Sequence, residues 1–229
     1  MEFRLVAAGD SAWSIELPDR IDVEVNTRAT EIAALVERAA LPAVTDVVVG
    51  YRSVMVYFDP LASDASTIRA RLDVLAAAPA PAGAARSTLI DVPACYGGSY
   101  GPDIADVAAF GRCSPDDVIR LHADTEYRVF VVGFVPGFAY MAPVDARIAI
   151  PRRSSPRLKV PAGSVAVAAG QTGIYPAETP GGWHVIGRTP IRPYDPDRER
   201  PFLFHPGDRV RFHRITESEY RATTAWGDS

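Results

Sequence analysis

The sequence predicts an α+β protein in which a small domain of strands and two helices precedes a larger, strand-rich domain. Three observations predict it. Over residues 1–77, apolar residues recur twice at helical spacing, and short strand-like runs lie around these two stretches. Residues 78–84 (APAPAGA) then interrupt the pattern with prolines and a glycine. Beyond them, residues 133–190 contain so much glycine and proline that helix is nearly excluded.

The chain opens with two strand candidates, residues 3–7 and 12–17, on either side of a turn-like Gly-Asp-Ser cluster. Residues 27–40 then predict an amphipathic helix, because apolar side chains fall at i, i+3, i+4 and i+7. These side chains are Ile32, Leu35, Val36 and Ala39.

A hairpin and a second helix complete the first domain. Residues 46–50 and 54–58 are strand candidates joined by Tyr-Arg-Ser. Residues 65–77 place Ile68, Leu72 and Leu75 on one helical face. Two helices against a few mainly antiparallel strands predict a ferredoxin-like α/β sandwich.

The proline-rich residues 78–84 are the best linker candidate, since they sustain neither a helix nor a central strand. We therefore expect a first domain over residues 1–84, linker included. A second domain over residues 85–229 carries the site, and its strands begin near Leu89.

The second domain includes two short helices, residues 103–110 and one that begins at Ser114. Ser114 can cap that helix, Pro115 suits its first position, and the two aspartates that follow complement its dipole. Residues 127–134 are apolar and β-branched, as in a strand. From there to about Ile215 we expect strands and turns.

Composition excludes several classes of function. The net charge of −4 argues against general affinity for nucleic acid or anionic membranes. Two cysteines without CxxC spacing predict neither a disulfide framework nor a zinc site, and we expect no metal. No apolar run is long enough to cross a membrane or to form the core of a secretion signal, so a cytoplasmic location is expected.

Residues 133–190 carry the functional signal. They hold eight glycines and eight prolines, together with six basic and two acidic side chains, a local charge of 6 − 2 = +4. Stiff turns and positive charge suit a small anion such as a carboxylate, carbamate or phosphate. A tightly turned β-barrel would need the same glycines and prolines at its corners, and both interpretations can hold.

Two cations stand out in this segment. In an extended strand Arg157 and Lys159 project to the same side, and without an adjacent acid they would form an anion clamp. Lys159 is the only lysine beside 23 arginines. A compact ammonium does work that a guanidinium cannot, so Lys159 is a candidate catalytic residue, although a chance surface lysine fits the composition equally well.

Other candidate residues could transfer a proton, form the walls of a binding site or bind the substrate. His184 or His122 is expected to manage a proton, although a histidine beside a tryptophan more often packs or hydrogen-bonds. Phe138 and Tyr140 could wall an apolar slot. The remaining candidates for substrate binding are Gln171, Thr172, Tyr175, Thr179, Gly181 and Gly182. No GxSxG, HExxH or GxxxxGK[ST] pattern occurs, so the chain is expected to form only part of a site.

Four ordered motifs resemble one family. They are CYGG with GPD at 95–103, GFVPGFAY at 133–140, PRLKVPAGSV at 156–165 and GQTGIYPAETPGGW at 170–183. Together they resemble the family of the small subunit of prokaryotic 5-oxoprolinase (PxpB), also called allophanate hydrolase subunit 1 or the kinase inhibitor KipI.

This resemblance implies a cyclophilin-like β-barrel after the ferredoxin-like domain. It also implies two partners, a larger PxpC/KipA-type subunit and a PxpA-type subunit. The complex is then expected to cleave 5-oxoproline to glutamate at the expense of ATP, and the resemblance does not identify the subunit that binds ATP. No methionine precedes a lysine, so this chain has no biotin attachment site. The alternatives are a KipI-like inhibitor of a sensor histidine kinase and a subunit of a urea- or allophanate-degrading system.

Overall fold

The chain divides into two units, Met1–Ser87 and Thr88–Ser229, in the computed structural model. The residues described are 1–20, 22–79 and 87–223. Most of the expected linker, and the expected boundary between residues 84 and 85, lie outside the described residues.

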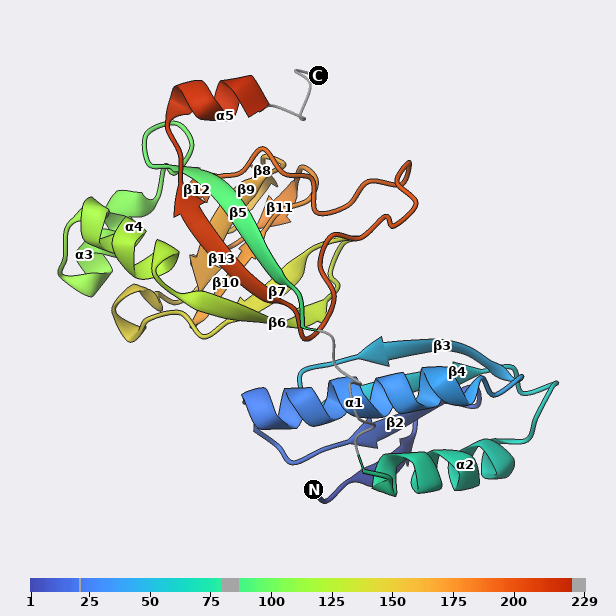
Figure 1. Cartoon of the computed structure of the whole chain (residues 1–229). Coiled ribbons are helices and arrows are strands. Elements are labelled where there is room, and N and C mark those ends of the chain that lie inside the picture. Colours follow the sequence, from blue (N-terminus) through green and yellow to red (C-terminus); the bar gives the residue numbers. More distant parts are fainter. Residues whose placement is uncertain (21, 80–86, 224–229) are drawn as a thin grey trace. The chain divides into compact units, whose positions relative to one another are not determined.

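The first unit is a four-stranded antiparallel sheet with two helices packed on it (Figure 1). The strand order is β1-β2-β4-β3, as expected for a ferredoxin-like sandwich whose outer strand precedes the first helix instead of following the second. The elements are β1 (Arg4–Ala7), β2 (Ala12–Glu16), α1 (Val23–Ala39), β3 (Val44–Val49), β4 (Ser53–Phe58) and α2 (Ala65–Ala77).

Side-chain caps set where these helices begin. The bounds of α2 agree with the predicted ones, and the Asp64 side chain accepts a hydrogen bond from the Thr67 N–H at 2.9 Å. Helix α1 begins before its predicted start, at Val23, because Asp22 accepts from the Val25 N–H at 2.8 Å. The earlier start buries Val25 beside the predicted core residue Ile32.

The second unit is a closed barrel in the order β10-β7-β6-β13-β5-β12-β9, so the expected barrel is confirmed. Strands β13 and β5 run parallel, and every other barrel pair is antiparallel. The barrel strands are β5 (Leu89–Tyr96), β6 (Glu126–Val132), β7 (Ala139–Ala142), β9 (Ser164–Ala168), β10 (Gln171–Ile174), β12 (His184–Arg188) and β13 (Arg209–Arg214).

Outside the barrel lie a small flap and several helices. The flap pairs β8 (Arg157–Val160) with β11 (Thr179–Gly181). The two predicted helices are confirmed as α3 (Ile104–Gly111) and α4 (Pro115–Ala123). Ser114 and Asp117 form a capping box at the start of α4.

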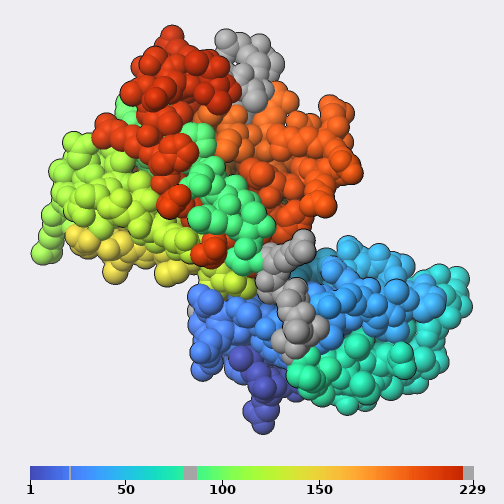
Figure 2. All heavy atoms as spheres, in the orientation of Figure 1, coloured from blue at the N-terminus to red at the C-terminus, as the bar shows by residue number. Residues whose placement is uncertain are grey.

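Two further helical elements were not predicted: a 3₁₀ turn, η1 (Ala146–Ile148), and the C-terminal helix α5 (Glu217–Thr223). Helix α5 directly follows β13 and is the red cluster at the top of Figure 2. In the described part of the chain, no helix has the length and apolar character needed to cross a membrane.

A polar network lies inside the barrel core around His122, which is fully buried. Thr172 Oγ1 donates to the Ala166 carbonyl at 3.1 Å, so it accepts from His122 Nε2–H at 2.8 Å. His122 Nδ1 then accepts from the Tyr96 hydroxyl at 2.8 Å. Burial lowers the pKa of His122 to about 3, so the ring is neutral and joins α4 to the barrel strands β5 and β10.

The buried His122 predicts a pH dependence of stability. As pH falls from 6.5 to 5, the unfolded chain takes up a proton at His122 that the folded chain cannot. The free energy of unfolding therefore falls by up to about 1.4 kcal/mol per pH unit from this residue. When the free energy of unfolding is measured with denaturant from pH 5 to pH 7, it should depend less steeply on pH in His122→Gln than in the wild type. Tyr96→Phe should lower the free energy of unfolding but keep the wild-type dependence on pH. The same pH dependence in all three proteins would contradict the assignment of this effect to His122.

Gly101 predicts a second stability effect. A Cβ at this position would overlap the Ile186 backbone carbonyl of β12, which cannot move without breaking the barrel. Gly101→Ala should lower the free energy of unfolding by about 2–3 kcal/mol. The matched control is Gly133→Ala, whose Cβ would meet only Val131 Cγ1 at 4.0 Å. Equal denaturation midpoints for the two variants would contradict the predicted clash.

Candidate functional site

The functional segment forms a cleft of about 340 Å³ between the flap and the barrel, which we call the aromatic cleft. Six residues predicted from the sequence line it. They are Phe138, Tyr140, Tyr175, Thr179, Gly181 and Gly182. The motifs at 133–140 and 170–183 therefore meet at one place, although other strands and turns separate them in the sequence.

Edge-to-face ring packing builds the walls of the cleft. The centroid of Phe138 lies 4.8 Å from that of Tyr140, 5.2 Å from Tyr175 and 5.5 Å from Trp183. Such pairs hold each other in fixed orientations. Gly181 makes room for this packing, because a Cβ there would stand 2.8 Å from ring carbons of Tyr175. The cleft is thus rigid and largely apolar.

Two exposed residues stand at the rim of the cleft. Phe134 has a positive φ of 73°, which is uncommon outside glycine, and its side chain is 63% exposed. The Arg152 guanidinium lies over the Trp183 indole, 6.0 Å from the ring centroid. Among the residues that the structure describes, none forms an ion pair or hydrogen bond with the Arg152 side chain. In the sequence, Arg152 stood out only as part of the local positive charge.

Behind the cleft, the buried carboxylate of Asp103 joins three segments. Arg157 donates to both carboxylate oxygens at 2.6 and 2.7 Å, and Arg153 donates to Oδ1 at 3.2 Å. The Val185 backbone N–H donates to Oδ2 at 2.7 Å. Burial acts to raise the pKa of Asp103, but these hydrogen bonds and the two guanidinium charges outweigh it and keep the pKa low.

The premise of the expected anion clamp, that no acid is adjacent, does not hold. Arg157 forms an ion pair with Asp103, which comes much earlier in the chain. The hydrogen bond to Asp103 raises the pKa of Arg157. Lys159 is 77% exposed on the flap and pairs with Glu178 at 3.0 Å. Neither cation lines the aromatic cleft.

The two histidines also lie outside the cleft. His184 Nε2–H donates to the Pro151 carbonyl at 3.1 Å, and its buried Nδ1 has no hydrogen-bond partner among the described residues. Burial lowers the pKa of His184. His122 and Thr172 lie in the core network of the barrel, and Gln171 sits on β10 away from the cleft lining.

Asp103, Asp106 and His184 bring potential ligand atoms within 4.8 Å of one another. A carboxylate has about four lone-pair positions, and Asp103 uses them on donors from Arg153, Arg157 and Val185. A metal ion would have to displace a guanidinium from this carboxylate, so these contacts disfavour a metal there.

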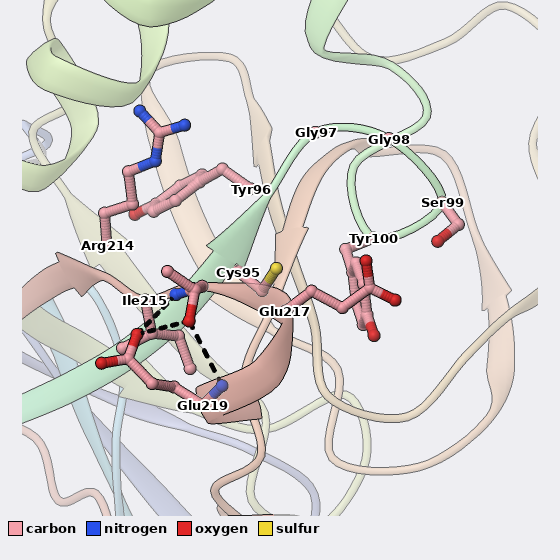
Figure 3. Close-up of a pocket in the computed structure, with 11 residues that line it drawn as sticks. Cys95, Tyr96, Gly97, Gly98, Ser99, Tyr100, Arg214, Ile215, Glu217 and Glu219 are labelled. Atoms are coloured by element: carbon pink, nitrogen blue, oxygen red, sulfur yellow. Dashed lines mark hydrogen bonds between the residues drawn. The ribbon is translucent and has the colours of Figure 1, made fainter. Parts of the chain in front are cut away.

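A second hollow of about 420 Å³ lies where β5 meets α5 (Figure 3). Its charged groups are already paired. Glu219 accepts from the Thr216 N–H at 2.7 Å, Glu217 pairs with Arg221 at 2.5 Å, and Arg214 pairs with Asp116 on α4. Cys95 lies at its wall, and burial raises the pKa of the thiol. Helix α5 is anchored by Tyr220, whose ring centroid lies 4.7 Å from that of Tyr100 in the loop after β5.

Comparison with known proteins gives consistent matches. The family model "Carboxyltransferase domain, subdomain C and D" matches residues 3–204. The B-type 5-oxoprolinase subunit of Bacillus subtilis is 35% identical over 232 residues, which cover 97% of each chain. A putative urea carboxylase of Emericella nidulans is 30% identical over 138 residues, covering 56% of this chain and 11% of that protein.

A solved structure shares the fold. The crystal structure of TTHA0988 superposes with a TM-score of 0.80 at 36% identity, covering 89% of this chain and 40% of that one. Because the family model spans most of the chain and the Bacillus subtilis protein matches along nearly its whole length, the chain belongs to the PxpB family of 5-oxoprolinase subunits, which is built on carboxyltransferase subdomains C and D.

Proposed function

We propose that this chain is a subunit of an ATP-dependent 5-oxoprolinase complex and contributes half of a composite site. The reaction adds water across the lactam C–N bond of 5-oxoproline, giving glutamate, and is coupled to ATP hydrolysis. The observation that carries this proposal is the match to the Bacillus subtilis 5-oxoprolinase subunit over 97% of both chains.

The chemistry of the aromatic cleft supports a half site. Its lining offers apolar rings, two phenols, a hydroxyl and one guanidinium, but no histidine, cysteine or carboxylate among the described residues. Burial raises the pKa values of Tyr140 and Tyr175, so both phenols stay protonated near neutral pH. A general base is therefore missing from this lining, and a partner subunit must supply it.

The partners that we propose are a PxpC/KipA-type larger subunit and a PxpA-type subunit. TTHA0988 favours a larger assembly, since the matching region covers only 40% of that longer chain. The cleft volume of about 340 Å³ suits a small molecule better than a nucleotide, so we place ATP on another subunit.

Lys159 is the residue of this chain that we propose to act at the junction with the partner. It projects from the flap into solvent, where only Glu178 holds it among the described residues, so a partner that covers the flap would desolvate it. His122 and His184 are buried and neutral, and we propose that they position the barrel and the flap.

A second candidate is a regulatory protein that inhibits a sensor histidine kinase. The exposure of Phe134 (63%) and Leu158 (87%) favours it, because exposed apolar side chains around a cleft mark protein contacts. A role in urea or allophanate breakdown is the third candidate, favoured by the match to a putative urea carboxylase.

Reconstitution separates these functions. We expect ATP-dependent release of glutamate from 5-oxoproline only when this chain is mixed with its PxpC-type and PxpA-type partners, measured by coupled glutamate and phosphate assays. Each protein alone should be inactive. Turnover by the isolated chain would contradict the half-site proposal, and a fully assembled complex that leaves 5-oxoproline intact would contradict the substrate.

The role of Lys159 is tested in the same complex. Lys159→Arg keeps the charge but changes its shape and acidity, so we expect the turnover rate to fall by about tenfold or more with the fold unchanged. Arg211→Lys is the matched control, since Arg211 pairs with Asp91 on the neighbouring barrel strand. Wild-type turnover in Lys159→Arg would show that the single lysine is incidental.

A further inference from the structure

We propose that the aromatic cleft binds a small, flat amide that bears a carboxylate, and that Arg152 is the residue that holds the carboxylate. This rests on the proposed function, because the cleft is the same site and 5-oxoproline belongs to this class. It adds the ligand-binding residue, the orientation of the ligand and a selectivity that the family match does not supply.

The charges around the cleft leave one cation available. Three of the nearby cations are occupied: Arg153 and Arg157 bind Asp103, and Lys159 binds Glu178. Arg152 has no such partner among the described residues, yet it lines the cleft. A guanidinium that lacks an acid and faces an apolar cleft provides a site for an incoming anion.

The position of Arg152 is fixed by its neighbours. Its guanidinium lies 6.0 Å from the centroid of the Trp183 ring, and Trp183 itself is only 5% exposed. On one side of Arg152, the Pro151 carbonyl accepts from His184. On the other side, the Arg153 N–H donates to the Gly182 carbonyl at 2.8 Å. The backbone on both sides of Arg152 is thus fixed before a ligand arrives, which reduces the entropy lost on binding.

The walls select the shape of the ligand. Phe138, Tyr175 and Trp183 are buried and pack edge to face, so the wall that they form cannot move aside for a bulky group. A cleft of about 340 Å³ is at the small end of ligand pockets. A five-membered lactam is flat, so it can lie against the exposed ring of Phe134 while its carboxylate points to Arg152.

Charge also predicts what the cleft rejects. A ring ammonium, as in proline, would be repelled by Arg152 and would lose its hydration against apolar walls. A lactam nitrogen is neutral and avoids both costs. The site should therefore prefer 5-oxoproline over proline, and it should prefer 5-oxoproline over 2-pyrrolidinone, which lacks the carboxylate.

The test is direct binding to the full chain, followed by tryptophan fluorescence, since Trp183 lies in the cleft wall. We expect a saturable change on titration with 5-oxoproline, which Trp183→Phe abolishes. Arg152→Gln should weaken binding at least about tenfold, as should the replacement of 5-oxoproline by 2-pyrrolidinone or proline. Arg152→Lys should bind with intermediate affinity, and the control Arg211→Gln should bind as the wild type does.

The outcomes separate this inference from the proposed function. The inference would be overturned if the wild-type chain gave no saturable response, or if Arg152→Gln bound as tightly as the wild type. Either result would count against it even if the reconstituted complex turns over 5-oxoproline. Binding with the predicted selectivity would support the inference even if the complex proved inactive on 5-oxoproline, a result that counts against the proposed function alone.

Discussion

The buried carboxylate of Asp103 is the contact on which the geometry of the site depends. It stands at the start of α3, and its donors come from Val185 on β12, Arg157 on the flap and Arg153 in the segment before the flap. A buried carboxylate is stable only when donors and positive charge compensate for its lost hydration. Because these donors lie on separate segments, satisfying one acid fixes the flap against the barrel.

This constraint also decides which cation is available to the proposed ligand. Arg153 and Arg157 turn inward to Asp103, whereas Arg152 faces the aromatic cleft. The rings that pack around Phe138 supply shape, and Arg152 supplies charge. The cleft lining holds no general base among the described residues, which explains why the chain is proposed to work with a partner.

Local signals in the sequence predicted local structure well. Helix α2 follows from its apolar periodicity and the start of α4 from the Ser114 cap, and six of the residues proposed from the motifs to bind substrate line one cleft. Long-range pairing was not accessible, because β13 joins β5 in parallel register from the opposite end of the domain sequence. For the same reason, the sequence did not predict that Arg157 pairs with Asp103, an acid at the start of another element.

If Asp103 holds the flap and therefore the cleft, removing its charge should loosen both. Amide hydrogen exchange in Asp103→Asn measures this, because the substitution keeps the shape of the side chain. We predict at least about tenfold faster exchange at the Val185 and Arg153 N–H groups, and unchanged exchange at the Val129 N–H, which bonds the Asp208 carbonyl inside the barrel. Equal exchange at all three amides in the variant and the wild type would show that Asp103 does not hold the flap.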